Sequence, residues 1–285
     1  MSERGRALEA RLAPGLVEQI LERLGCPPGA DPDLQHLARL YGAWCQSVPF
    51  DNVRKLIHVR GAHTGPLPGD GPTEYFEAWL KHGCGGTCWA GNGALHALLT
   101  ALGFSSQRGV AAMLASPNAP PGHGTVVVDC EGARTLLDAS MLHGLPLRLM
   151  DDGPTHVEHA AWGVRCGPRD GRWHVTWRPL HRMADLDCRI EHLHADRQEF
   201  HDRHEATRGW SPFNFELMVR VNRGDAVVGT ALGARVVIEP NGQLIRTALS
   251  PDERRAWLIE GLGLSEELVM AIPPDIPTPP PPAPR

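Results

Sequence analysis

The stretch GCGGTCWAGN, residues Gly83–Asn92, marks the point at which a glycine-rich loop turns into a helix. Paired glycines before a helix permit a tight backbone and the close approach of a ligand. Cys88 then falls at or near a helix N-terminus, where unpaired N–H groups and the positive end of the helix dipole stabilise a thiolate. Cys88 is therefore a candidate nucleophile. The alternative, common for a free cysteine, is a small buried apolar residue.

The chain on both sides of this stretch has helical periodicity. Apolar residues recur at helical spacing over residues 16–24 and 34–44, and a short amphipathic stretch follows at 75–80. The helix that begins near Cys88 has an apolar stripe up to Leu102, and the glycine after it is suited to end the helix. These patterns predict that the first hundred residues are mainly helical.

Beyond residue 104 the apolar pattern changes to a period near two, which is typical of strands. Turn residues punctuate these strands and predict four hairpins, around Glu131-Gly132, residues 168–171, residues 222–225 and Asn241-Gly242. The Asn-Gly pair is the clearest of the four and predicts a type I′ turn. A capping box at Ser250 then opens a last helix. Helices followed by antiparallel strands and a mixed ending predict an α+β fold.

The first hairpin brings a histidine and an acid together. If residues 131–132 form a two-residue turn, Asp138 lies opposite Thr125, and His123 is its diagonal neighbour on the same face. A three-residue loop would reverse the parity and separate them. A carboxylate on one imidazole nitrogen leaves the other nitrogen to take a proton from a thiol. The pattern therefore predicts a Cys88-His123-Asp138 triad; the alternative is a solvated cross-strand pair.

The composition bounds the class of protein. With 285 residues, 31.1 kDa and 42% hydrophobic residues, the chain can bury a large core. A net charge of −5 gives no electrostatic reason to expect a nucleic-acid partner. No apolar run reaches the roughly eighteen residues that cross a membrane, and the first residues lack a signal-like apolar segment. Seven scattered cysteines suit reduced thiols. We expect a cytoplasmic protein without nucleic-acid or membrane partners.

The order of these motifs resembles the arylamine N-acetyltransferase family, of which this chain would be an atypical member. That family carries an Arg-Gly-Gly-x-Cys motif at a helix start and a histidine and an aspartate on later strands. The matching segments are Gly85-Gly86-Thr87-Cys88 with Asn92, His123-Gly124-Thr125-Val126, Leu137-Asp138, Val48-Pro49-Phe50-Asp51-Asn52 and Ser211-Pro212-Phe213. The resemblance covers about residues 16–270 in matched order.

The resemblance implies an N-terminal helical bundle, an antiparallel β-barrel and a C-terminal α/β lid, with a core similar to that of cysteine proteases and transglutaminases. We expect the helical bundle with the nucleophile over residues 1–104, the barrel domain with the histidine and aspartate over 105–205, the lid over 206–271 and a proline-rich, extended tail over 272–285.

The resemblance also implies an acyltransferase. Cys88 would be acylated by acetyl-CoA or another acyl thioester, and a small-molecule amine would take the acyl group, with His123 moving protons and Asp138 orienting it. The acyl thioester is then a co-substrate, and no cofactor or metal is bound tightly. Substrate contacts are expected from Trp89, Phe50 and Phe213.

Two departures from the family bear on this interpretation. Cys84 replaces the family's arginine, which permits a disulfide with Cys88, although simple loss of the arginine is the preferred interpretation. The glycine-containing loop near the cofactor reads Ser140, Met141, Leu142 here, so these residues are candidate but altered cofactor contacts.

The departures leave three alternatives open: an amide synthase with an acyl carrier protein as donor, a thiol hydrolase or transglutaminase-like enzyme, and an inactive binding relative.

The histidines of residues 181–204 suggest a metal site, since His201 and His204 share a helix face. However, no cysteine pair accompanies them, and the surrounding charges predict a solvated helix.

Overall fold

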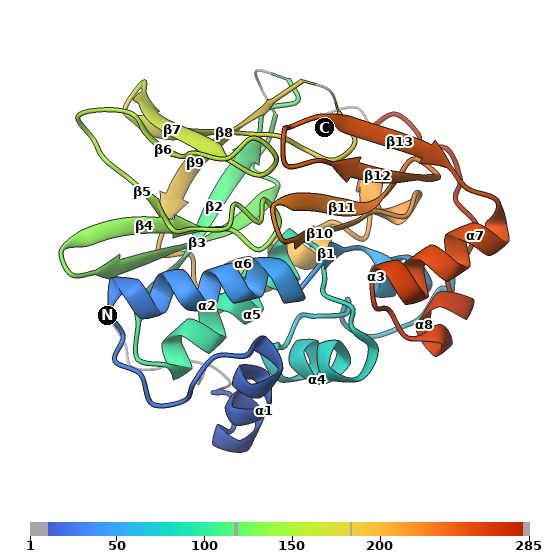
Figure 1. The fold of residues 1–285 in the computed structure, drawn as a ribbon, viewed down its shortest axis with the longest axis horizontal. Coiled ribbons are helices and arrows are strands. Elements are labelled where there is room, and N and C mark those ends of the chain that lie inside the picture. Colours follow the sequence, from blue (N-terminus) through green and yellow to red (C-terminus); the bar gives the residue numbers. More distant parts are fainter. Residues whose placement is uncertain (1–10, 117–118, 183, 282–285) are drawn as a thin grey trace.

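The structure is a computed structural model that describes residues 11–116, 119–182 and 184–281. Helices and strands are mixed in an α+β arrangement, with a layer of helices below a strongly curved sheet and a second sheet beside it (Figure 1). The predicted α+β class is confirmed.

Five helices make up the N-terminal region: α1 (Pro14–Leu24), α2 (Leu34–Ser47), α3 (Val53–Arg60), α4 (Pro72–His82) and α5 (Cys88–Ala101). Local sequence explains their ends. A glycine in the left-handed conformation, Gly25 with φ 68°, ends α1. The side chain of Asp33 accepts a hydrogen bond from the backbone N–H of His36 at 2.6 Å and so caps α2.

Helix α5 lies at the centre of the molecule and is buried on nearly all sides. It packs between α4 and the strands β2 (Ser105–Met113) and β3 (His123–Cys130). Leu95, Leu98 and Leu99 lie in the largest apolar cluster together with α1 and α2 side chains. Because α5 is held on both sides, the position of its first residue, Cys88, is set by the core.

The curved sheet has eight strands in the order β5-β4-β3-β2-β9-β8-β7-β6. The further strands are β4 (Ala133–Leu137), β5 (Leu147–Arg148), β6 (Thr155–Val157), β7 (Val164–Arg169), β8 (Arg172–Trp177) and β9 (Leu186–Leu193). The outermost strands β5 and β6 contact each other, so the sheet is a nearly closed barrel. Its interior is filled by apolar side chains such as Val127, Val175 and Cys188.

The hairpin between β3 and β4 has the predicted two-residue turn. Glu131 and Gly132 both have positive φ, 49° and 73°, and Cys130 pairs with Ala133. In the β7–β8 and β10–β11 hairpins the strands run further than predicted and leave only residues 170–171 and 224–225 as turns.

The second sheet has the order β1-β10-β11-β12-β13. Its strands are β1 (Phe50–Asp51), β10 (Val219–Arg223), β11 (Ala226–Ala231), β12 (Ala234–Ile238) and β13 (Leu244–Ala248). Since β1 precedes α3, this sheet is joined directly to the helical region. Helix α7 (Pro251–Ala256) starts with the predicted Ser250–Glu253 capping box, continues through a π-turn at Trp257–Gly261 and is followed by α8 (Glu266–Met270).

The predicted type I′ turn at Asn241-Gly242 is wrong. The backbone N–H of Glu239 donates to the carbonyl of Gln243 at 2.8 Å, so the loop has three residues, 240–242. Only Gly242 has positive φ, 84°. The reason is Pro240, which lacks the N–H that would pair with the carbonyl of Gln243 in a two-residue hairpin and whose fixed φ suits the first central position of a type I turn. The type I′ pair joining β11 to β12 is Leu232-Gly233, which was not predicted.

Residues 273–281 of the proline-rich tail form neither helix nor strand and lie against α7 and the segment that precedes β10, while residues 282–285 lie outside the described residues. The carboxylate of Asp275 accepts from the backbone N–H of Leu217 at 2.8 Å and pairs with Arg254 at 2.9 Å. The backbone N–H of Ile276 donates to the carbonyl of Phe215 at 3.1 Å. Among the described residues, no helix combines the length and apolarity that a membrane crossing requires.

Candidate active site

Cys88 is the first residue of α5 and is 7% exposed. The loop that leads into Cys88 is held in place by the buried carboxylate of Asp51, which accepts a hydrogen bond from the backbone N–H of Gly85 at 2.5 Å. Gly85 itself must be a glycine, because a Cβ atom there would lie 1.8 Å from the carbonyl oxygen of Pro49. The Cys88 Sγ lies 3.9 Å from the carbonyl oxygen of Gly122.

His123 and Asp138 meet as the hairpin register predicts. The His123 Nε2 atom lies 2.7 Å from Asp138 Oδ2, and both side chains are buried. The other carboxylate oxygen accepts from the backbone N–H groups of Ser140 at 2.8 Å and Met141 at 3.0 Å. Every carboxylate oxygen of Asp138 is therefore occupied, and its position is fixed.

Burial and charge act in opposite directions on this pair. Burial alone would lower the pKa of His123, but the Asp138 charge and hydrogen bond, together with Cys88, raise that pKa to about 10. Burial would raise the pKa of Asp138, but His123 and the backbone donors outweigh it and lower the pKa. The pair is therefore an imidazolium and a carboxylate at neutral pH.

The Cys88 side chain completes the array by hydrogen bonding to His123, an interaction that contributes to the raised pKa of His123. Asp138 occupies Nε2, so Nδ1 is the ring nitrogen left for the thiol. The three predicted residues are thus brought together. A sulfur next to a positively charged, oriented imidazole is equipped for nucleophilic attack and proton transfer.

Asn92 was given no role by sequence reasoning, yet its side chain joins the three segments of the array. The amide nitrogen donates to the carbonyls of Cys88 at 3.1 Å and Gly124 at 2.6 Å, and the amide oxygen accepts from the backbone N–H of Ala139 at 2.9 Å. An asparagine inside a helix, one turn after the cysteine, was the available signal, because asparagine is a weak helix former.

Tyr41 from α2 was also missed. Its buried hydroxyl donates to the carbonyl of Asp138 at 2.9 Å and accepts from the backbone N–H groups of Asp138 at 3.1 Å and His143 at 3.3 Å. The hydroxyl therefore uses its donor and both acceptor positions on the turn that carries the acid. No short-range pattern connects Tyr41 with a residue 97 positions later.

The predicted substrate-contact residues lie around this array in two places. Trp89 packs edge-on against Phe200 with ring centroids 5.0 Å apart. Phe50 and Phe213 pack against each other in the helical core, with ring centroids 5.3 Å apart. The direct contact of any of the three with substrate remains a prediction.

The predicted cofactor loop is buried. Ser140, Met141 and Leu142 are all buried, and Leu142 adopts a positive φ of 52°. The loop supplies backbone donors to the acid, and its contact with a cofactor remains a prediction.

Cys84 lies apart from the array. It is fully buried in a different apolar cluster, with Val53 and Leu56, and its thiol donates to the carbonyl of Ala78 at 3.7 Å. Burial raises the pKa of the Cys84 thiol to about 12. All seven cysteines are free, so the structure contains no disulfide between Cys84 and Cys88.

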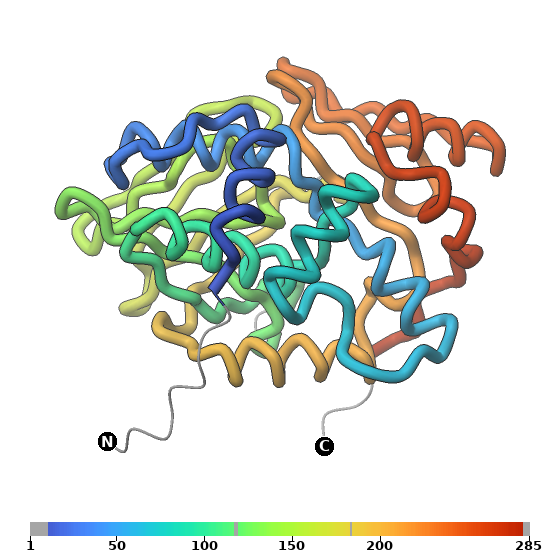
Figure 2. The backbone as a smooth tube through the Cα atoms, turned by 90° about the horizontal axis from the view of Figure 1, so that it is seen from below, coloured from blue at the N-terminus to red at the C-terminus, as the bar shows by residue number. Residues whose placement is uncertain are grey.

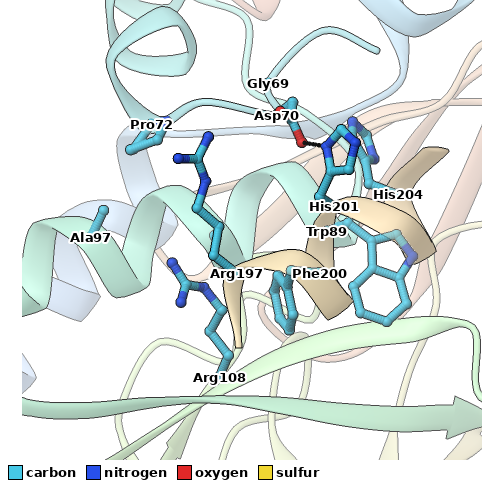
Figure 3. A pocket seen from close by; sticks show the side chains of 11 residues that line it. Gly69, Asp70, Pro72, Trp89, Ala97, Arg108, Arg197, Phe200, His201 and His204 are labelled. Atoms are coloured by element: carbon cyan, nitrogen blue, oxygen red, sulfur yellow. Dashed lines mark hydrogen bonds and ion pairs between the residues drawn. The ribbon is translucent and has the colours of Figure 1, made fainter. Parts of the chain in front are cut away.

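The expectation of a solvated helix in the histidine-rich segment is confirmed for α6 (Arg197–Ala206), most of whose side chains are at least partly exposed, and is wrong for residues 186–193, which form β9. Helix α6 runs along the edge of the molecule (Figure 2) and buries Phe200 and His204 against its neighbours. His201 pairs with Asp70 at 2.6 Å beside a cavity that Trp89 also lines (Figure 3). The described residues hold no group of three or more side chains suited to bind a metal ion.

Comparisons with known proteins agree with this geometry. A family model described as N-acetyltransferase matches residues 33–164, which include all three residues of the array. No curated protein sequence matches the chain significantly.

Solved structures of arylamine N-acetyltransferases match over most of their length. The Mycobacterium abscessus enzyme has 19% identity and a TM-score of 0.75, with 90% of this chain and 93% of that chain covered. The Mycobacterium marinum enzyme in complex with CoA has 19% identity and a TM-score of 0.73, with 90% and 93% covered. A Bacillus cereus enzyme described as having a Cys-His-Glu catalytic triad has 15% identity and a TM-score of 0.71, with 89% and 100% covered.

The fold of this chain is therefore that of the arylamine N-acetyltransferases. Residues 33–164 also match the N-acetyltransferase family in sequence, which confirms the resemblance noted from the motifs.

Proposed function

We propose that the protein is an acyltransferase that moves an acyl group from a thioester donor to an amine through a Cys88 acyl-enzyme. The observation that carries the proposal is the buried array of Cys88, His123 and Asp138 within a segment that matches the N-acetyltransferase family. The arylamine N-acetyltransferase fold supports it.

The geometry supports a two-step reaction. The Cys88 thiolate attacks the thioester carbonyl, the donor carbon–sulfur bond breaks, and His123 gives a proton to the departing thiolate. The amine then attacks the acyl-enzyme and loses a proton to His123, and the amide leaves as the Cys88 sulfur departs. First-turn N–H groups of α5, which have no intrahelical acceptor, suit the developing oxyanion.

The donor assignment rests on a relative, the Mycobacterium marinum enzyme solved with CoA. We assign acetyl-CoA or a related acyl-CoA as co-substrate and a small-molecule amine, of the arylamine class, as acceptor. The loop Ser140, Met141, Leu142 departs from the family's glycine-containing pattern, and the alternative that this departure motivates is an amide synthase that takes its acyl group from a carrier protein. The free cysteines suit a reducing, cytoplasmic setting.

Intact mass spectrometry after exposure to acetyl-CoA tests the proposal. Wild-type protein should gain one acetyl group, Cys88→Ala should gain none, and an added arylamine should remove the adduct as the acetylated amine. Loss of the adduct at a rate that the amine does not change would favour a thiol hydrolase. A wild-type protein that never gains the adduct from acetyl-CoA or from an acyl carrier protein would indicate a binding relative.

A further inference from the structure

Lysine is almost absent from this chain. Of 28 Lys and Arg residues only two are lysines, Lys55 and Lys81. Lys81 is exposed and pairs with Glu267 at 3.3 Å. Lys55, on α3, is only 4% exposed. A buried ammonium is costly without a counter-charge, so a lysine at such a position in an arginine-rich chain needs a partner.

The hydrogen-bond partners around the Lys55 ammonium are uncharged, and they fix the orientation of the ammonium. Its Nζ donates to the Thr207 hydroxyl at 2.8 Å, and that hydroxyl donates to the carbonyl of His204 at 2.6 Å. The side-chain amide of Asn214 donates to the carbonyl of Thr207 at 3.0 Å. These bonds orient the ammonium but supply no negative charge.

The nearby acid is already engaged. Glu205 accepts from the guanidinium of Arg208 at 2.8 and 3.0 Å and from the backbone N–H of Leu67 at 2.5 Å. Within the described part of the chain, Lys55 forms no ion pair with any carboxylate. The counter-charge must therefore come from another group.

That group is the Cys88 sulfur. Asp51, in β1, binds the backbone N–H of Gly85 three residues before Cys88, and α3 begins two residues after Asp51. Thr207, the partner of Lys55, follows the end of α6, whose Phe200 packs edge-on against Trp89, the neighbour of Cys88. Both contacts place Lys55 beside the start of α5. Burial lowers the pKa of Lys55 to about 8, and the strongest effect opposing this is the charge interaction with Cys88. The ammonium is thus mainly charged at neutral pH.

We propose that Lys55 is a second cation serving the Cys88 sulfur: it stabilises the thiolate from the α3 side, while His123 does so from the β3 side. The inference deepens the proposed function and rests on Cys88 being its nucleophile. Lys55 transfers no proton in this role. The negative charge that it stabilises disappears when the sulfur–acyl bond forms and returns when the amine takes the acyl group.

The other titratable groups facing this site do not compensate for a loss of Lys55. Burial lowers the pKa of His204 to about 4, so it is neutral. Burial raises the pKa of Cys188 well above its usual value, so it is a thiol. Glu205 and Arg208 neutralise each other. Asp138 is paired with His123. The cations that act on the sulfur near pH 7 are therefore His123 and Lys55.

The pH dependence of Cys88 alkylation by iodoacetamide, followed by peptide mass spectrometry, tests the inference. Lys55→Met should shift the alkylation midpoint to higher pH and slow alkylation about tenfold at pH 6, with rates converging at high pH. Lys55→Arg should keep the wild-type midpoint, because it keeps the charge. Lys81→Met is the matched control on the surface and should behave as wild type.

A purely structural role for Lys55 gives a different result. In that case Lys55→Met lowers the unfolding temperature and leaves the alkylation midpoint unchanged, which would overturn the inference. If Lys55→Met does not fold, Thr207→Val removes the orienting bond with the charge intact and should shift the midpoint by a smaller amount. An unchanged midpoint there would also overturn it. Alkylation needs no acyl donor, so this test is independent of the acetyl-transfer test.

Discussion

Cys84 and Cys88 lie four residues apart in one loop–helix segment, yet their surroundings give them opposite properties. Cys84 is packed among apolar side chains beneath α3, where burial raises the pKa of its thiol to about 12. Cys88 begins a helix and faces the imidazolium of His123. The difference teaches that thiol chemistry here depends on oriented charge next to the sulfur, since both cysteines are buried.

Replacing each cysteine separately gives the largest contrast. Cys88→Ala should reduce acyl transfer at least about 10³-fold, because no other group replaces the nucleophile. Cys84→Ala should keep the rate within about threefold and cost about 1–2 kcal/mol of unfolding free energy through a small cavity. Amine acetylation rates and urea denaturation measure both effects. Equal rate losses in the two variants would contradict the contrast.

Asp138→Asn tests whether orientation of the imidazole distinguishes the Cys88 site. The amide keeps the shape but loses the charge that holds His123 protonated, so we expect the acylation rate to fall about 10³-fold, as when other triads lose their acid. Single-turnover acylation with acetyl-CoA measures the change. Asp129→Asn is the control, since the half-buried Asp129 pairs with Arg134 near the end of β3 opposite to His123, and its rate should stay near that of wild type.

Asn92→Ala tests the hydrogen bonds that join the segments around Cys88 and that have no counterpart around Cys84. The change leaves two carbonyls and one backbone N–H without their side-chain partner, so we expect a loss of about 2–4 kcal/mol in unfolding free energy. Urea denaturation measures it. The same substitution at Asn241, in an exposed loop, should change stability by less than about 0.5 kcal/mol. If Asn92→Ala lowered the free energy of unfolding by as little as the Asn241 control does, Asn92 would not be what joins these segments.

The raised pKa of His123 predicts a gradual effect, a slope in the free energy of unfolding against pH. His123 has a pKa of about 10 in the folded protein and an ordinary value of 6.5. Its stabilising contribution is therefore fully present below pH 6.5 and is lost as the pH rises through 10, by at most about 1.4 kcal/mol per pH unit. Unfolding free energies from pH 6 to 10 should show this slope in wild type, and His123→Gln should remove it. Identical slopes would contradict the assignment.

Short-range signals predicted much of the site. Two positive-φ positions at Glu131 and Gly132 follow from the turn preference of that pair, and the resulting parity placed His123 and Asp138 on one face. The start of α5 at Cys88 follows from the glycines before it. The same kind of reasoning failed at Asn241, where the preceding Pro240 determined the turn type instead.

Long-range contacts could not be predicted in the same way. The polar sequence of α6 indicated a solvent-exposed helix, but Phe200 and His204 are sufficient to hold it against α5 and the loop at Pro68. Tyr41 and Lys55 resemble many other residues in their sequence context. Their importance depends on what lies opposite them in space.

The amino-acid sequence by itself determined where helices and strands form, which cysteine begins a helix and which face of the hairpin carries the acid. These features depend on interactions between residues a few positions apart. The tertiary structure decided which of the two cysteines meets a charged imidazole, and that Asn92, Tyr41 and Lys55 surround it. The physical reason is that these contacts arise only when segments distant along the chain pack around α5 and exclude water from the charges they bring together.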